Sequence, residues 1–388
     1  MTDLNYNDYL TPYIPDSKFR IKEGDNKDLL LNNVFFRKED TKNDFINKFD
    51  LVIIGIQDER NTENKGARKA PDKIRTELYK LYSPSKIKLA DLGNLKSGKT
   101  VKDTYIALTE IVYELLMNEM AVIFLGGSKD SIVPLCKAYE KGKKNFSICV
   151  AEPKFDLNDY EESHGPGSYL NEIISENKRL FNYSNIGYQS YYNSADNISY
   201  INDNYEAVRL GMARTFIFHN EPYIRDADFF AVDVKSVKRS DAPGTNEPST
   251  NGFYGEEICQ LSRYAGLSDK VSIFGIFELN PDLDKDNRTS ELAAQMTWYF
   301  IQSFYNRKNE FPDPVVKKFQ KYIVNIEGVN ESINFYKSPK SGRWWVEVNY
   351  AVKNDERSRL VACSYEDYIK ATRNEIPERW WKLFNKLN

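Results

Sequence analysis

Histidine is scarce in this sequence: its 388 residues contain only His164 and His219. A site that needs several imidazoles is therefore excluded before any motif is considered. Cysteine is also scarce, and its spacing matches neither a zinc site nor a disulfide framework. We expect the four cysteines to be reduced and mostly buried, which predicts a cytoplasmic protein. They are Cys136, Cys149, Cys259 and Cys363.

The chain also lacks an excess of charge and a long apolar run. Lys and Arg number 54 against 57 Asp and Glu, so nothing in the composition favours binding to nucleic acid or to an anionic membrane. No apolar run is long enough to span a bilayer. The opening "MTDLNYNDYL" has neither the basic flank nor the apolar stretch of a signal peptide. We expect no nucleic-acid partner and no membrane span.

What the chain does have is a series of short apolar runs that alternate with helical patterns. The runs are rich in β-branched and aromatic residues without strict alternation, which is typical of strands buried on both faces. Helices are predicted over 71–82, 103–118 and 289–305. This order favours an α/β fold with a mainly parallel, doubly wound sheet under helices on both faces. The runs lie at 51–55, 120–127, 146–152, 185–189, 228–234 and 271–280.

Both ends of the chain differ from this α/β region. Residues 1–45 are polar and irregular, and we interpret them as an N-terminal extension to an α/β domain over 46–311. Residues 312–388 predict short antiparallel strands followed by a closing helix pair, an α+β addition docked on the core. Its tryptophans are expected to pack that addition rather than to hold a ligand. They are Trp344, Trp345, Trp380 and Trp381.

Charged residues stand where the predicted strands end. In open parallel sheets the site lies outside the carboxyl ends of the strands, so we expect these residues to converge on one crevice. Burying them is costly unless they pair with one another. The strand ends read "GGSKDS" (126–131), "EPKFD" (152–156), "VDVK" (232–235) and "FELNP" (277–281).

These motifs, in this order, resemble those of the arginase–agmatinase–formimidoylglutamase family, the ureohydrolases, over about residues 50–305. The "SDAPG", "NGFYGEE" and "IPERWW" stretches look like a divergent bacterial subgroup often labelled formimidoylglutamase. The resemblance implies an arginase-like three-layer α/β/α sandwich with N-terminal and C-terminal additions. Its other motifs match "GARKAPDKIR" (66–75), "DLGN" (91–94), "APGT" (242–245) and "ELNP" (278–281).

In the family, two manganese ions activate the attacking hydroxide. Three of the six positions that match the family's metal ligands are lysine in this chain. A protonated lysine has no lone pair to offer a metal, so the resemblance implies a degenerate metal site that binds no metal, and a protein without a cofactor. The six positions are Lys129, Glu152, Lys154, Asp156, Asp233 and Lys235.

The charges at these positions suggest what replaces the metal. Three ammonium groups balance three carboxylates, so we expect a neutral, self-satisfied salt-bridge cluster. The alternative is that the six residues are scattered surface charges, because lysines mostly stay exposed.

The substrate side of the site is less altered. His164 matches the family's proton-shuttling histidine and Glu278 the carboxylate that grips the guanidinium; both are vestigial catalytic candidates in this chain. His164 could equally be an ordinary loop residue, because a general acid needs a nucleophile to serve. Arg68 is expected at the mouth of the pocket or in solvent, and His219 is expected to be structural.

Three functions remain open at this point. We expect a pseudoenzyme, retained for binding an unknown protein partner or for assembly as a homo-oligomer. The first alternative is a formimidoylglutamase-type amidinohydrolase that cleaves a linear amidine C–N bond and uses manganese. The second is a metal-free enzyme in which a desolvated lysine acts as a base or a Schiff-base nucleophile.

Overall fold

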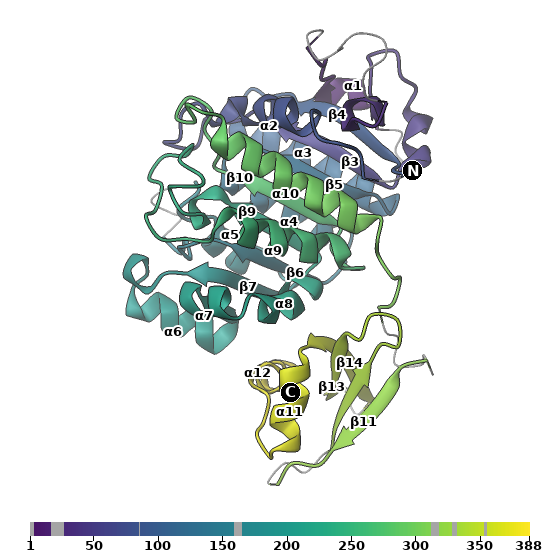
Figure 1. Cartoon of the computed structure of the whole chain (residues 1–388), viewed down its shortest axis with the longest axis vertical. Coiled ribbons are helices and arrows are strands. Elements are labelled where there is room, and N and C mark those ends of the chain that lie inside the picture. Colours follow the sequence, from purple (N-terminus) through teal and green to yellow (C-terminus); the bar gives the residue numbers. More distant parts are fainter. Residues whose placement is uncertain are drawn as a thin grey trace.

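The computed structural model describes residues 4–16, 27–84, 86–158, 165–311, 318–327, 332–352 and 355–388. Within these ranges the chain forms a large α/β unit and a smaller antiparallel unit at the C-terminus (Figure 1). No helix in the described ranges is long and apolar enough to cross a membrane.

The large unit is built on a ten-stranded sheet of order β1-β4-β3-β5-β10-β9-β6-β7-β8, with β2 also paired to β4. Its strand pairs are parallel except β1 with β4. The strands are β1 (Leu10–Thr11), β2 (Val34–Phe36), β3 (Leu51–Ile56), β4 (Leu89–Leu95), β5 (Ala121–Leu125), β6 (Phe146–Ala151), β7 (Leu180–Tyr188), β8 (Glu206–Arg209), β9 (Phe229–Asp233) and β10 (Ile273–Phe277).

Helices cover both faces of this sheet, so the predicted three-layer α/β/α architecture is confirmed (Figure 1). One layer contains α2 (Ala70–Leu78), α8 (Glu221–Arg225), α9 (Gly255–Leu267) and α10 (Arg288–Phe304). The other contains α3 (Val101–Met117), α4 (Ile132–Lys141) and α5 (Tyr169–Glu176). Shorter helices are α1 (Tyr6–Tyr9), α6 (Ala195–Asn204) and α7 (Leu210–Thr215).

The apolar runs become strands because both of their faces are covered. Every residue of β3, β5, β6, β9 and β10 is buried, and their side chains divide between two apolar clusters, one under each helical layer. Helix α3 begins at Val101, two residues before the predicted start, because the Thr100 hydroxyl and the Asp103 carboxylate each accept a backbone N–H, a reciprocal capping box.

The N-terminal extension is more regular than its polar sequence suggested. Strands β1 and β2 both pair with β4, at one edge of the large sheet. Strand β4 was itself not predicted as a strand. It carries the "DLGN" motif, whose charged and amide side chains interrupt the apolar run, and burial in the sheet overrides that weak local signal.

The C-terminal unit has the predicted order of antiparallel strands followed by a helix pair. Its sheet runs β11-β12-β13-β14. Trp344, Trp345 and Trp380 are buried as expected, whereas Trp381 is 47% exposed. The domain boundaries at 45/46 and 311/312 stay predictions. The elements are β11 (Gln320–Val324), β12 (Ile333–Lys337), β13 (Trp344–Val352), β14 (Asp355–Cys363), α11 (Tyr365–Thr372) and α12 (Glu378–Leu387).

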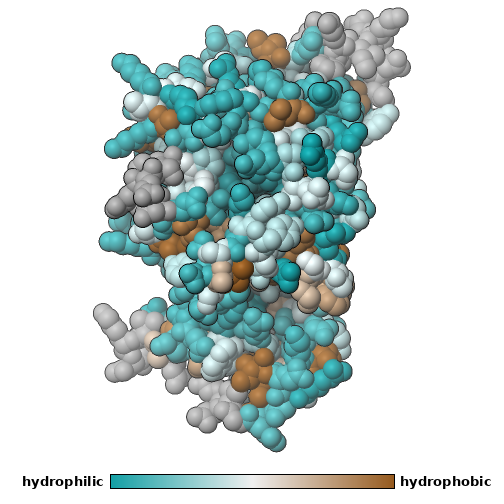
Figure 2. All heavy atoms as spheres, turned by 90° about the vertical axis from the view of Figure 1, so that its left-hand side faces the viewer, coloured by the Kyte–Doolittle hydropathy of each residue, from teal (hydrophilic) through white to brown (hydrophobic). Residues whose placement is uncertain are grey.

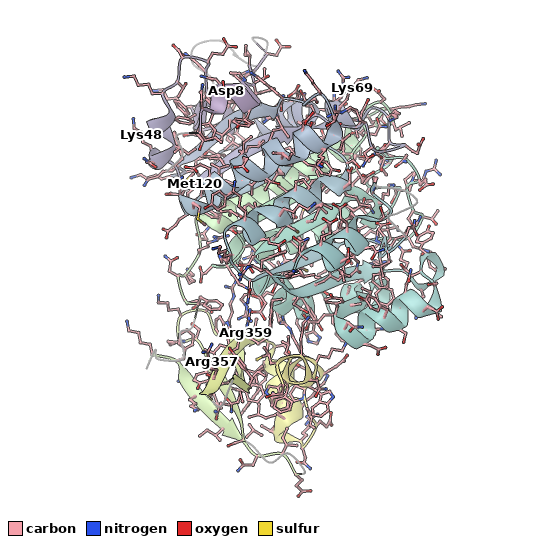
Figure 3. The ribbon with its side chains drawn as sticks, turned by 180° about the vertical axis from the view of Figure 1, so that it is seen from behind. Asp8, Lys48, Lys69, Met120, Arg357 and Arg359 are labelled. Carbon is pink, nitrogen blue, oxygen red and sulfur yellow. The ribbon has the colours of Figure 1, made fainter. Side chains whose placement is uncertain are left out.

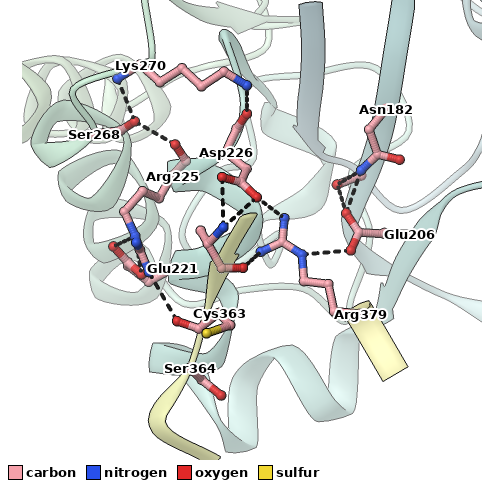
Figure 4. A network of polar contacts seen from close by, with 12 residues as sticks. Asn182, Glu206, Glu221, Arg225, Asp226, Ser268, Lys270, Cys363, Ser364 and Arg379 are labelled. Atoms are coloured by element: carbon pink, nitrogen blue, oxygen red, sulfur yellow. Dashed lines mark hydrogen bonds and ion pairs between the residues drawn. The ribbon is translucent and has the colours of Figure 1, made fainter. Parts of the chain in front are cut away.

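Buried ion pairs join the two units (Figure 4). Arg379 on α12 donates to Glu206 on β8 at 2.8 Å and to Asp226 at 2.8 Å. Arg225 of the large unit donates to the backbone carbonyls of Trp344 and Cys363. Seen from behind, Arg359 also lies at this junction (Figure 3), where its guanidinium stacks 3.5 Å from the Phe181 ring centroid. The C-terminal unit is thereby fixed to the β7–β8 side of the large sheet.

Candidate active site

The loop after β3 and the start of α2 form a rigid frame for the site. Arg75 is fully buried and holds both oxygens of Asp91, at 2.7 and 2.9 Å, so α2 and β4 are tied together. Gly126 after β5 has φ 70. A Cβ there would lie 2.6 Å from Pro71, so the close approach of these two segments requires glycine.

A polar cavity of about 890 Å³ opens at the carboxyl ends of the parallel strands. Its lining includes residues from the loop after β3 and from the ends of β5, β6, β9 and β10. The predicted convergence of these strand ends is therefore observed. The side of the molecule seen in Figure 2 is mostly hydrophilic, with its hydrophobic residues in small groups.

Lys129 lies at the floor of this cavity among three carboxylates. Its Nζ is 2.9 Å from Asp233, 3.6 Å from Glu152 and in close contact with Asp156. Burial by itself lowers the pKa of Lys129, but Asp156, Asp233 and Glu152 more than offset this and raise its pKa well above the ordinary value. Lys129 is therefore a fixed cation.

Glu152 is fully buried behind Lys129. Burial raises its pKa to about 8, although Lys129 acts in the opposite direction. The hydroxyls of Tyr169 and Tyr183 donate to its Oε1 at 2.7 and 2.8 Å. Burial thus favours the protonated form of this carboxyl more strongly than in an ordinary glutamate.

Glu278 follows β10 and faces the same cavity. Its Oε1 accepts the backbone N–H of Lys129 at 2.9 Å and the Ser128 hydroxyl at 3.1 Å, and Asn64 donates to its Oε2 at 3.3 Å. Lys235 Nζ lies 3.7 Å away. Burial and the nearby Asp233 raise the pKa of Glu278. The carboxylate is thus held in one orientation from three sides.

The expected neutral cluster of six residues is not what the structure shows. Lys154 is exposed, with its Nζ 5.6 Å from the ring centroid of Tyr192, and belongs to the cavity wall. Glu278 takes its place near the floor, so four carboxylates face two lysines. Even with Glu152 protonated, the three other carboxylates outnumber Lys129 and Lys235 by one. The sequence could not reveal this, because the direction of a side chain beyond a strand end depends on the local backbone.

The remaining predicted residues contribute less. His164 lies outside the described residues. Arg68 is exposed and its backbone N–H donates to Glu59, while Arg60, Thr62 and Lys65 of the same loop line the cavity. His219 stacks against Phe216 and Phe218.

Sequence reasoning missed a backbone feature of the site. Asp156, Glu247 and Glu278 line the cavity in the left-handed region, with φ of 42, 54 and 68. For residues other than glycine this conformation costs about 1 kcal/mol or more each. The identity of the two glutamates does not signal it, because left-handed non-glycine positions favour asparagine and aspartate, the residue type of Asp156. Such strain gathers at functional sites, where it orients side chains.

An open parallel sheet between two helical layers, with a polar cavity at its carboxyl ends, defines a doubly wound α/β protein. The chain belongs to the arginase family, whose sequence profile matches residues 49–302. The predicted family is therefore confirmed.

Relatives and solved structures agree with this assignment. Formimidoylglutamase of Staphylococcus haemolyticus is 27% identical over 270 residues, covering 66% of this chain and 86% of the relative. Formiminoglutamase of Trypanosoma cruzi, solved with Mn²⁺, superposes with a TM-score of 0.62 at 23% identity, covering 67% and 94% of the two chains. Formimidoylglutamase of Bacillus subtilis gives 0.65 at 19% identity, covering 76% and 98%.

These findings correct two predictions. The expectation of a pseudoenzyme is wrong, because the proteins that this chain resembles carry the names of hydrolases. The expectation of no cofactor is also contradicted, because neighbours in fold were solved with Mn²⁺.

The side chains of this chain nevertheless do not fit a manganese pair as they stand. The ammonium of Lys129 lies among the carboxylates and has no lone pair for a metal. In the described part of the chain, no group of three or more His, Cys, Asp or Glu side chains is arranged to hold a metal ion. The carboxyl groups of the floor can, by contrast, bind and orient an organic cation and hold a proton.

Proposed function

We propose that this protein is an amidinohydrolase of the formimidoylglutamase type, which hydrolyses the C–N bond of a linear amidine. The observation that supports this most is the excess of carboxylates over lysines at the floor of the cavity. Such a floor attracts a cation, and an amidinium is a planar cation with several N–H donors. Carboxylates accept such donors in charge-assisted pairs. The names of the relatives favour the same substrate class.

Glu278 is the residue we assign to the amidinium. Its oxygens are fixed by Ser128, Asn64 and the backbone of Lys129, so it is oriented before the substrate binds. Its raised pKa brings it nearer to the range in which a carboxyl can both take and return a proton. One carboxyl could thus bind the cation and exchange protons with it.

The reaction adds one water molecule across the C–N bond. The water oxygen becomes the carbonyl oxygen of the released amide, and for an amidinium both water protons end on the departing amine, which leaves as an ammonium group. For an N-formimidoyl amino acid the products are formamide and the free amino acid. A residue that accepts a proton from water and delivers one to the amine satisfies this balance, and Glu278 lies on the cavity surface where both steps would occur.

The test is hydrolysis of N-formimidoyl-L-glutamate by the full chain, followed by NMR for formamide and glutamate, with added Mn²⁺ and with a chelator. We expect product formation, reduced about 100-fold or more in Glu278→Gln. Lys69→Met is the matched control, because Lys69 pairs with Asp282 in an exposed ion pair. Absence of product under every metal condition would refute the proposal.

The location and the assembly of the protein stay proposals too. The four cysteines are free and buried, which suits a reducing compartment such as the cytoplasm. A protein partner or a homo-oligomer stays a prediction from the sequence.

A further inference from the structure

We propose that Lys154 and Lys235 form a carboxylate-binding pair in the wall of the cavity, a specificity site for substrates that carry an acidic group. The nature of the substrate rests on the proposed function. The binding of a carboxylate by these two lysines does not, and it can be tested without turnover.

The sheet register places the two lysines at the same level. Strands β6 and β9 are parallel neighbours, and Ala151 pairs with Val232. Lys154 and Lys235 each stand three residues after that pair, Lys154 in the loop that follows β6 and Lys235 in the 3-10 turn that follows β9. Neighbouring strands lie about 4.8 Å apart, so the two segments that carry these lysines begin side by side at the sheet edge. Both residues line the cavity.

The ammonium group of Lys154 has no carboxylate partner among the described residues, and that of Lys235 has one, Glu278, at a longer distance. The Nζ of Lys154 lies against the Tyr192 ring, 5.6 Å from its centroid. The Nζ of Lys235 lies 3.7 Å from the carboxylate of Glu278, which is longer than a hydrogen bond. Lys129, by contrast, has three carboxylates around one ammonium. Lys154 is thus available to a ligand and Lys235 has only one longer contact, whereas Lys129 is surrounded by carboxylates.

The chemistry of the pair fits a carboxylate. Two ammonium groups on flexible stems can each donate to one oxygen of the same group, without the planar fork of arginine. The Tyr192 face stabilises the cation of Lys154 while leaving its N–H donors free. A ligand with an amidinium at one end and a carboxylate at the other would meet the acidic floor and the basic wall together. An amidine without a carboxylate would meet only the floor.

Calorimetric titration of the full chain with L-glutamate and, separately, with formamidinium tests this pair. We expect Lys154→Met to weaken glutamate binding about tenfold and to leave formamidinium binding unchanged, while Lys154→Arg retains most of the affinity. Lys235→Met should weaken glutamate binding similarly. Lys69→Met, which removes an exposed lysine outside the cavity, should change neither. Because Lys154 is exposed, its variants are expected to fold, and thermal melting verifies this.

The outcomes separate the two proposals. Equal glutamate affinity in the wild type and Lys154→Met overturns the carboxylate pair, as does a wild type that binds no glutamate. Loss of affinity in Lys69→Met as well would overturn it, since the effect would then be general. If no amidine is hydrolysed but glutamate binding depends on Lys154, the pair stands and the proposed function fails. If hydrolysis proceeds with an unchanged KM in Lys154→Met, the pair fails and the function stands.

Discussion

At the junction of the two units, ion pairs join Arg225, Arg343 and Arg379 to nearby carboxylates, whereas around the cavity floor two lysines face four carboxylates. The junction pairs Arg379 with Glu206 and Asp226, and both Arg225 and Arg343 with Glu221. Its charges are paired. The floor is unbalanced and opens to a cavity of about 890 Å³.

The difference shows two uses of buried charge. A desolvated charge is tolerated when it is paired and hydrogen-bonded. The junction meets this condition by itself, because Arg379 also donates to the backbone carbonyl of Ala362 and Arg225 to two others. The carboxylates of the cavity floor are not all paired unless a further cation binds there. We therefore infer that the ion pairs of the junction stabilise the fold, and that the carboxylates of the floor bind a cation.

The largest effect is expected at the junction. Arg379→Met leaves Asp226 and the buried Glu206 without their cation at the junction, so the free energy of unfolding should fall by about 3–5 kcal/mol. Urea denaturation measures this, with Lys382→Met as the control, because Lys382 pairs with the exposed Glu378. A loss no larger than that of the control would mean that the junction does not clamp the two units together.

A smaller loss is expected at the floor. Lys129→Met leaves Glu152, Asp156 and Asp233 unpaired, but the open cavity admits water and the carboxylates can take protons. We expect the free energy of unfolding at neutral pH to fall by about 2–3 kcal/mol. The loss should shrink in acid, where protonation removes the repulsion. A loss that is independent of pH would contradict a charged floor.

The titration of Glu152 further distinguishes the cavity floor from the junction, through the pH dependence of stability. Its pKa in the folded protein is about 8, above the ordinary 4.5 of a glutamate in the unfolded chain. Between these values the folded state binds a proton that the unfolded state has released, so this group makes stability fall as pH rises through that window. Glu152→Gln removes the titration. We expect the variant to gain on the wild type as pH rises from about 5 to about 8, measured by thermal melting across that range. A constant difference would show that Glu152 is ionised throughout.

The smallest effect concerns backbone strain at the cavity rim. Glu247 has φ 54 and is exposed, so Glu247→Gly should change the free energy of unfolding by at most about 1 kcal/mol, in the stabilising direction if relief of strain outweighs chain entropy. Lys143 also has φ 54 and is not part of the cavity lining. Lys143→Gly should therefore shift the melting temperature similarly. Only the Glu247 variant should alter glutamate binding.

The amino-acid sequence determined most of the large unit. Six apolar runs predicted β3, β5, β6, β7, β9 and β10, since strands buried on both faces are mostly apolar. The order of the motifs then predicted the arginase family. It also predicted that the strand ends carrying these motifs meet at one cavity. Strand β4 and the N-terminal strands were missed, because their polar or short sequences form strands only through pairing in the sheet.

The tertiary structure decided which charges meet. Lys129 and Lys154 both stand where the family motif has histidine, yet one is buried among carboxylates and the other is exposed. Arg379 finds Glu206 across 173 positions of the chain. Residue identity fixes a charge, but its direction beyond a strand end depends on backbone angles, and its partners depend on how distant segments pack. Those two properties belong to the folded chain.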